Sequence, residues 1–314
     1  MKRLLFSVSA IAAVLMAVSC HKEPDVPEGE EAVVSIRLEV PASVAAKSIA
    51  QAEHTDIVYY EVWSDDWSRR FYPAVDGTLE SVPVVGKKAS VELTLVKNKT
   101  YNLIFWACNE NAGAYDVSSL TNVGIRYEKI AANGNQDVYD AFYAVEPLHV
   151  GDGFDGVRVE LERPFAQLNF AVDNLDTFFG KLNVSSSTVT VPRLATVFDT
   201  RLGTGKVPAA APVTFKASGL VPTTDKITYE GVDYTWVTMD YMLMMDEHDV
   251  VDVTASFTLD GNASPVTHVV HNVPLHKNRR TNILGSIFTA DASLTVIVDD
   301  TFDDDDEIIN ITNY

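Results

Sequence analysis

The chain has 314 residues, of which 46% are hydrophobic, and a formal net charge of −20 at pH 7. Its length suffices for one large or two ordinary domains, each with a core of buried apolar side chains. A surface this acidic repels phosphate backbones, which excludes nucleic acid as an expected partner. Only two cysteines occur, Cys20 and Cys108.

The first 19 residues have the composition of a secretory signal peptide. Two basic residues precede an apolar run over residues 4–18, which is shorter than the roughly 20 residues of a membrane-spanning helix. Residues 17–19 with Cys20 resemble a bacterial lipobox, which implies that Cys20 is lipidated and becomes the first residue after cleavage. A plain signal peptide with a stray cysteine is the alternative, but it leaves the position of the thiol unexplained. Two acyl chains on Cys20 would give stable anchoring.

Residues 20–31 are predicted to form a lipidated flexible tether, because proline, glycine and acidic residues leave little to bury. The charged residues after Cys20 resemble the export signal that sends lipoproteins of Bacteroidota to the outer face of the outer membrane. We therefore expect a lipid-anchored outer-membrane protein at the cell surface. With Cys20 acylated, Cys108 has no intramolecular partner, so a disulfide framework is excluded.

Apolar side chains alternate with polar ones along much of the chain, a pattern that predicts half-buried β-strands. The alternation covers residues 34–40, 58–62, 91–95, 157–161, 166–172, 251–259 and 294–298. Turn sequences rich in glycine, asparagine and aspartate separate these runs. Helical periodicity is nearly absent, and only residues 174–182 are compatible with a short helix. The sequence predicts an all-β fold of antiparallel sheets packed as β-sandwiches.

The length after signal-peptide removal exceeds one comfortable sandwich core, so two domains are expected. The strand over residues 157–163 runs into Pro164, which cannot donate a hydrogen bond to a sheet. A boundary near residues 160–164 gives an N-terminal β-sandwich over residues 32–162. It leaves a C-terminal β-sandwich with an acidic tail over residues 163–314.

Two segments resemble the fimbrillin-like proteins of Bacteroidota, the type V pilins and their accessory subunits: LERPFAQLNF (161–170) and NRRTNILGSIFTADASLTVIVDDTF (278–302). The resemblance implies two tandem transthyretin-like β-sandwiches and export as a lipoprotein. In the shaft pilins of that family, a protease cuts after a basic residue beyond the first strand, and subunits then join by donating strands. The expected partners are therefore other pilus subunits, and the expected role is that of a structural, anchor or tip subunit.

Residues 41–56, between the first two predicted strands, are small and polar enough for an exposed loop. Lys47 is the one strongly basic residue in it, which makes Lys47 the candidate site of proteolytic maturation. An arginine-specific protease would find no site there, since Arg37 lies in the middle of a strand. An uncut anchor or accessory subunit would have the same feature. Residues 307–314 are the candidate donor strand, because Ile309 and Ile311 alternate on one face.

The sequence offers little that indicates chemistry. His268 and His271 lie three apart, which on a strand places them on opposite faces. The acidic and histidine residues 246–249 are predicted to form a polar hairpin tip, and GTGK (203–206) lacks the context of a phosphate-binding loop. The acidic residues 299–307 lack the alternation of a calcium loop and are predicted to be solvated. We expect no catalytic, cofactor-binding or metal-binding residues, and a protein that is not an enzyme.

The aromatic stretch EVWSDDWSRRFYP (61–73) admits two interpretations. Trp63, Trp67, Phe71 and Tyr72 could form a platform on which sugar rings stack. Alternatively, Trp63 and Phe71 belong to the core of a hairpin whose turn is SDDWSR, and this is the interpretation we favour. The second candidate function is accordingly a monomeric surface lipoprotein that binds a glycan or host ligand. Such a protein would keep its first strand, whereas a polymerising pilin would lose it.

Overall fold

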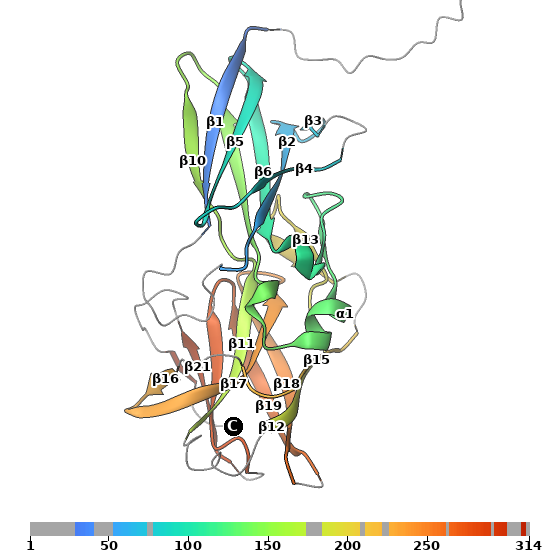
Figure 1. The fold of residues 1–314 in the computed structure, drawn as a ribbon, viewed down its shortest axis with the longest axis vertical. Helices are drawn as coiled ribbons and strands as arrows, with labels where there is room; N and C mark the ends of the chain where they lie inside the picture. The colour runs from blue at the N-terminus through green and yellow to red at the C-terminus, as the bar shows by residue number, and fades with distance from the viewer. Residues whose placement is uncertain are drawn as a thin grey trace, which may run out of the picture.

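The structure is a computed structural model that describes residues 29–40, 53–73, 78–173, 184–207, 211–221, 226–261, 264–289 and 292–299, together with the backbone of residues 309–311. The molecule is elongated, and its two β-sandwiches follow one another along the long axis (Figure 1). The predicted all-β fold of two sandwiches is therefore confirmed. None of the helices in the described ranges is both long and apolar enough to cross a bilayer.

The N-terminal sandwich consists of two sheets. One has three strands in the order β10 (Gly156–Glu160), β1 (Glu31–Glu39) and β5 (Lys88–Val96). The facing sheet has the order β3 (Arg70–Tyr72), β2 (Ile57–Ser64), β6 (Thr100–Cys108) and β9 (Phe142–His149), and β4 (Glu80–Pro83) also pairs with β2. The pairing is antiparallel, as predicted, except that β1 and β10 run parallel. The apolar faces of the two sheets enclose one core.

The C-terminal sandwich is larger. One of its sheets has the order β16 (Lys226–Tyr229), β17 (Val232–Leu243), β11 (Phe165–Asp173), β20 (Arg280–Gly285), β21 (Leu294–Asp299) and β22 (Ile309–Ile311). The facing sheet has the order β15 (Val213–Ala217), β12 (Val184–Val191), β18 (His248–Leu259) and β19 (Val266–His276). Here β11 and β20 form the parallel pair. The main core lies between the two sheets, where Phe170 meets Phe257 at a ring-centroid distance of 5.6 Å.

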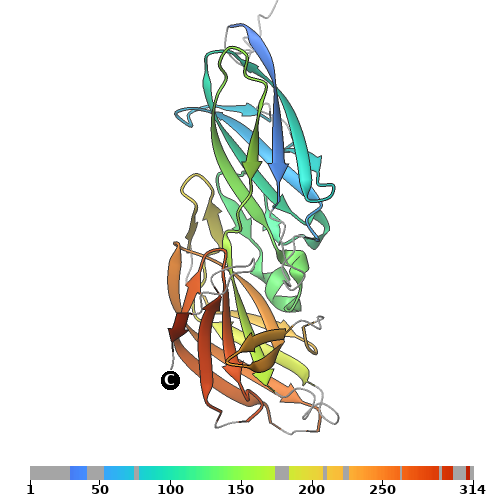
Figure 2. The same ribbon diagram turned by 90° about the vertical axis from the view of Figure 1, so that its left-hand side faces the viewer.

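Residues 109–141, which we call the bridging segment, connect β6 to β9 and pack against the C-terminal sandwich. The segment contains β7 (Tyr115–Asp116), β8 (Val123–Ile125), α1 (Tyr127–Ile130) and the short 3₁₀ helices η1 (Glu110–Ala112), η2 (Ala131–Asn133) and η3 (Asp137–Tyr139). In a four-stranded sheet, β8 pairs with β13 (Val197–Asp199), which pairs with β14 (Thr204–Lys206). Apolar side chains of the segment join the C-terminal core, and α1 lies beside β15 (Figure 1). The helices of the segment, in green, lie where the two sandwiches meet (Figure 2).

Asn135 attaches the bridging segment to an edge of the C-terminal sandwich. Its backbone N–H donates to the carbonyl of Met239, and its side-chain amide donates to the carbonyl of Val237. The amide oxygen in turn accepts from the N–H of Met239 at 2.9 Å, so one residue replaces part of a neighbouring strand. The N–H of Gly134 donates to the carbonyl of Lys216 on β15. These two residues therefore link the edges of both sheets.

A buried ion pair fixes the junction between the sandwiches. The Arg163 guanidinium, just before β11, donates two hydrogen bonds to the carboxylate of Asp140, at 2.6 and 2.7 Å. Both side chains are 3% exposed. Arg163 also donates to Asn278 at 2.9 Å and lies over the ring of Phe142 at 4.7 Å. Three chain segments meet at one cation, so their relative positions are fixed by hydrogen-bond geometry.

Two strands are buried on both faces, which the alternation does not predict. On β6, Leu103 and Phe105 face the N-terminal core, whereas Ile104 and Trp106 face the core formed with the bridging segment. On β11, residues 165–172 are all buried, including the polar Gln167 and Asn169. The prediction that residues 166–172 expose one face to water is wrong. The amide of Asn169 donates to Asn282 at 2.9 Å, which partly offsets the cost of burying it.

Candidate functional site

β1 is the middle strand of the three-stranded sheet, and its inward side chains are completely buried. Val34, Ile36 and Leu38 have 0% exposed surface and Val40 has 2%, so the predicted core face of this strand is confirmed. Val33, on the opposite face, is 65% exposed. The four buried side chains fill the N-terminal core against β5 and against the facing sheet.

β5 and β10 hold β1 from both sides. Nine residue pairs join β1 to β5 and five join it to β10. At the start of β10 a Cβ on Gly156 would lie 2.2 Å from the carbonyl oxygen of Ser35, and the φ of Gly156 is +153°. Only glycine permits this approach. Without β1, the flanking strands would border an apolar groove with unpaired backbone groups along both edges.

The ends of β1 are tied by backbone hydrogen bonds. Near its start, the N–H of Lys97 donates to the carbonyl of Glu30, and at its end the N–H of Val40 donates to the carbonyl of Lys87. The N–H of Leu161 donates to the carbonyl of Glu39. The predicted lipidation site Cys20 and the predicted cleavage site Lys47 lie outside the described residues, as does the predicted short helix at 174–182.

The C-terminal residues that we considered as a donor strand pair within their own chain. The backbone of Ile309–Ile311 forms β22, which is antiparallel to β21 and extends the six-stranded sheet. The position beyond β20 is thus occupied by β21 and then by β22. Most of the acidic segment 299–307 lies outside the described residues.

The aromatic stretch forms a hairpin whose side chains pack on the cores, as the favoured interpretation predicts. The N–H of Ser64 donates to the carbonyl of Arg69 and closes the turn. Trp63 packs against the core of the bridging segment and donates its indole N–H to Glu61 at 2.8 Å. Phe71 packs against the N-terminal core, 5.4 Å from the ring of Tyr101. Trp67 contacts Trp63 at a ring-centroid distance of 6.3 Å.

The histidine pair of the second half is divided between two faces, as its spacing predicts. His268 is 6% exposed, and its Nε2–H donates to the carbonyl of Ile287 at 2.7 Å. His271 is exposed beside Asp252. Among the described residues, no group of three or more histidine, cysteine, aspartate or glutamate side chains is arranged to hold a metal ion.

Two further sequence features have structural roles. Lys206 of the GTGK sequence donates to Asp199 at 2.6 Å across the β13–β14 hairpin, where it cannot serve as a phosphate-loop lysine. Residues 246–249 do not form a hairpin tip, and that prediction is wrong. Residues 244–247 connect β17 to β18, which belong to opposite sheets, and His248 and Asp249 begin β18. The chain crosses the sandwich here, and within the crossing the N–H of Met245 donates to the carboxylate of Asp249 at 2.8 Å.

Cys108 ends β6 and is a free thiol that is 3% exposed. Burial, reinforced by the nearby carboxylate of Asp56, raises its pKa to about 12. A thiol in this environment is protonated at physiological pH and has little nucleophilic character. The burial of Cys108 therefore supports a role in core packing rather than in catalysis.

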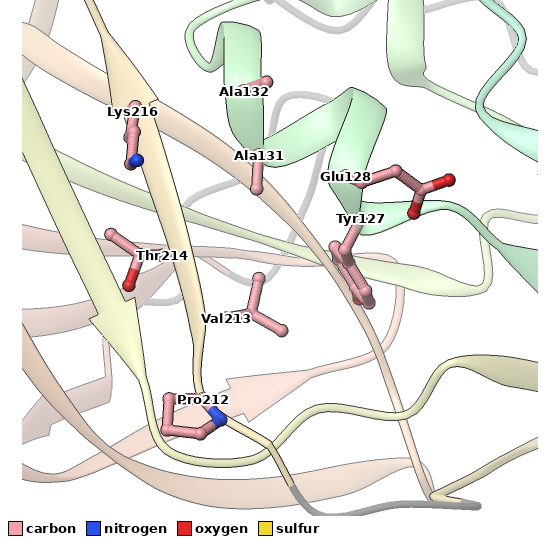
Figure 3. A pocket seen from close by; sticks show the side chains of 8 residues that line it. All are labelled: Tyr127, Glu128, Ala131, Ala132, Pro212, Val213, Thr214 and Lys216. Atoms are coloured by element: carbon pink, nitrogen blue, oxygen red, sulfur yellow. The ribbon is translucent and has the colours of Figure 1, made fainter.

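A pocket of about 360 Å³ lies between α1, η2 and β15 (Figure 3). It is lined by Tyr127, Glu128, Ala131, Ala132, Pro212, Val213, Thr214 and Lys216. The hydroxyl of Tyr127 is occupied, since it accepts from the N–H of Leu243 at 2.9 Å. Apolar side chains form most of the lining, and Glu128 and Lys216 add one charge of each sign. Such a lining suits a small ligand with both polar and apolar parts.

Several solved structures are similar to this fold. A protein of Bacteroides ovatus assigned to cell adhesion aligns with a TM-score of 0.52 and 13% identity, over 88% of this chain and 100% of that one. A fimbrial assembly protein of Parabacteroides distasonis aligns with a TM-score of 0.43 and 14% identity, over 90% and 100%. The fimbrial anchor protein Mfa2 of Porphyromonas gingivalis aligns with a TM-score of 0.44 and 9% identity, over 90% and 100%.

The similarity to the Bacteroides ovatus protein confirms the two-sandwich fold that the resemblance to fimbrillin-like proteins implied. No curated protein matches the sequence. One family model matches residues 26–313, which is almost the whole of the chain beyond the predicted signal peptide. The chain therefore belongs to the family of unknown function DUF6562.

Proposed function

We propose that this chain is a surface-exported fimbrial or adhesin subunit whose N-terminal sandwich exchanges β1 for a strand of another subunit. The observation that carries the proposal is the complete burial of Val34, Ile36 and Leu38 in the middle of a three-stranded sheet. Burying such a side chain stabilises a protein by roughly 1.5–3 kcal/mol, so these three and Val40 contribute about 6–12 kcal/mol. A whole domain is typically stable by roughly 5–15 kcal/mol. Loss of β1 would leave a sandwich that needs a replacement strand.

The position of β1 in the chain makes the exchange topologically simple. β1 is the first strand of the described residues, and the other described strands follow it along the chain. One cut between β1 and β2, for which Lys47 is the proposed site, would release it. β-Strand addition is an established mode by which proteins fill such a groove. The C-terminal residues around Ile309 and Ile311 remain the proposed donor, and donation would require them to leave β21.

We further propose that Cys20 carries the lipid anchor and that the residues between Cys20 and β1 tether the sandwiches to the outer membrane. The build of the first 19 residues and the lipobox-like sequence before Cys20 support this. The domain division at residues 160–164 belongs to the same proposal. It fits the end of β10 at Glu160 and the start of β11 at Phe165. A structural role, without enzymatic activity, agrees with the cell-adhesion assignment of the similar Bacteroides ovatus protein.

A second candidate function is a monomeric surface lipoprotein that binds a glycan or host ligand and keeps β1. The pocket beside α1 is the observation that favours it, because its lining mixes apolar and charged side chains (Figure 3). The two functions differ in the fate of β1.

The test is to cut the purified protein at a specific protease site built around Lys47 and to add a synthetic peptide of residues 31–41. Cut protein should form ladders that survive mild detergent, and the peptide should block their formation. A control peptide with aspartate in place of Ile36 and Leu38 should not block it, since it cannot fill the apolar groove. Cut protein that stays a stable monomer after losing β1, or a site that no protease reaches in the folded protein, would favour the ligand-binding lipoprotein.

A further inference from the structure

Two histidines face each other across neighbouring strands of the C-terminal sandwich. His248 begins β18 and His276 ends β19, and the two are directly paired in the antiparallel register. Directly opposed residues have Cβ atoms about 4.5–5.5 Å apart and project from the same face. The two imidazole rings are in contact, with centroids 4.2 Å apart and planes at 66°. Residues 28 positions apart in the sequence are thus brought to one point.

We propose that His248 and His276 form a binding site for one divalent transition-metal ion, such as Zn²⁺ or Cu²⁺. Imidazole nitrogens bind Zn²⁺ at about 2.0–2.1 Å, so two of them on one tetrahedral ion lie about 3.3 Å apart. Rings that already touch reach this separation by rotation about their broad terminal side-chain torsions. Water, or a ligand from a second molecule, takes the remaining coordination positions. Imidazole favours Cu²⁺ and Zn²⁺, and Cu²⁺ binds the more tightly.

The charges around the pair favour a cation. Glu247 precedes His248, and Asp249 follows it. The Lys277 ammonium, on the residue that follows His276, lies 3.2 Å from the carboxylate of Glu247 and 3.7 Å from that of Glu162. Its charge is therefore balanced by two carboxylates. His248 is exposed and His276 is partly buried, so an ion can enter from solvent without any rearrangement of the sheet.

The remaining histidines near this sheet lack the same arrangement. The Nε2 of His268 is used by the carbonyl of Ile287. His271 stands on the exposed face beside Asp252, with the nearest atoms of the two side chains 3.3 Å apart. His271 therefore offers a matched control, because it is an exposed histidine on the same strand, β19, and has no second imidazole opposite it.

The experiment is calorimetric titration of the purified full chain with Zn²⁺ and, separately, with Cu²⁺ at pH 7.5. One ion should bind per chain, more tightly for Cu²⁺. His248→Ala and His276→Gln should each weaken binding at least tenfold. The affinity of the double variant should equal that of the weaker-binding single variant within a factor of about three. His271→Ala should bind as the unchanged chain does. Binding should also weaken at least tenfold at pH 5.5, because protonated imidazoles cannot ligate a metal.

Three results would overturn the proposal: no uptake of either ion, uptake equal in His248→Ala and the unchanged chain, or displacement of the bound ion by excess Ca²⁺. The last two would place the ion on carboxylates, such as those of the acidic residues 299–307, because neutral imidazoles discriminate against Ca²⁺. A thermal unfolding curve for each variant separates lost binding from lost folding. His248 is exposed, so its substitution should leave that curve unchanged.

Discussion

The two sandwiches share one strand plan but are completed in different ways. In each, the first strand lies between an antiparallel and a parallel neighbour: β1 between β5 and β10, and β11 between β17 and β20. In each facing sheet the antiparallel pairs also correspond, with β2, β6 and β9 matched by β12, β18 and β19. The fold thus contains a structural repeat that the sequence does not show.

The difference lies in what surrounds the first strand. β11 is connected at both ends, is buried on both faces, and belongs to a sheet extended by β16, β21 and β22. Its sandwich is further covered by the bridging segment. β1 belongs to a sheet of three strands, with Val33 exposed on its outer face. The proposed strand exchange is assigned to the N-terminal sandwich because its first strand belongs to the smaller and less covered sheet.

The largest effect is expected at the junction. Arg163→Ala should lower the free energy of unfolding by about 3–5 kcal/mol, because it leaves the buried Asp140 carboxylate without its partner. If the bridging segment joins the two halves, the loss should appear in the C-terminal sandwich as well as in the N-terminal one. Urea denaturation followed by tryptophan fluorescence measures the change.

Two controls define that result. Arg158→Ala removes a guanidinium that is 60% exposed and pairs with Glu39 and Glu160 at the surface, so it should cost less than about 1 kcal/mol. Arg163→Met combined with Asp140→Leu removes both charges and should recover much of the loss. If Arg163→Ala lowers the free energy of unfolding no more than Arg158→Ala does, the ion pair does not hold the sandwiches together.

A smaller effect is expected inside the two first strands. Leu38→Ala on β1 and Leu168→Ala on β11 remove equivalent buried side chains, both 0% exposed, and each should cost about 2–5 kcal/mol. The consequences should differ. Leu38→Ala should release β1 and speed proteolysis between β1 and β2, whereas Leu168→Ala should leave β1 protected. Limited proteolysis followed by mass spectrometry distinguishes the two outcomes.

Val33→Ala provides the baseline, since its side chain is 65% exposed and its loss should change stability by less than about 0.5 kcal/mol. If Leu168→Ala exposes the β1–β2 connection as strongly as Leu38→Ala does, the two sandwiches unfold as one unit. The proposal that β1 can leave while the C-terminal sandwich stays folded would then be wrong.

The strands with one solvent-exposed face could be predicted from the sequence, and the strands buried on both faces could not. Alternation places Val34, Ile36 and Leu38 in a core because polar residues, Ser35 and Arg37, separate them along the strand. The run over residues 100–108 is nearly all apolar, so it carries no period from which two separate cores could be inferred. Gln167 and Asn169 alternate with apolar residues, yet both are buried. A polar residue signals water only when nothing else covers that face.

The candidate groove was predictable for the same reason, whereas the closeness of His248 and His276 was not. The groove follows from local alternation on one strand. The histidine pair depends on the register of β18 against β19, which a one-residue slip would abolish. The role of Asn135 also escaped prediction, because an asparagine in the turn sequence ANGN indicates a turn and says nothing about the strand edge that it will cover.

The smallest effect is expected at Cys108, where a change in reactivity rather than stability distinguishes the two cores. The thiol ends β6 on the face toward the core of the bridging segment, and burial raises its pKa to about 12. At pH 8 the folded thiol should therefore react with iodoacetamide at least about a thousandfold more slowly than the unfolded chain, since access requires an opening that costs about 4 kcal/mol or more.

Protein that has lost β1 should keep most of this protection, because β1 packs against the opposite face of β6, where Leu103 and Phe105 lie. Alkylation at the unfolded rate after removal of β1 would show that the two cores are one cooperative unit, and a disulfide-linked dimer as the main native species would show that the thiol is not buried as described. Protection that survives the loss of β1 would mean that the C-terminal sandwich, with its bridging segment, stays folded while the N-terminal groove is empty.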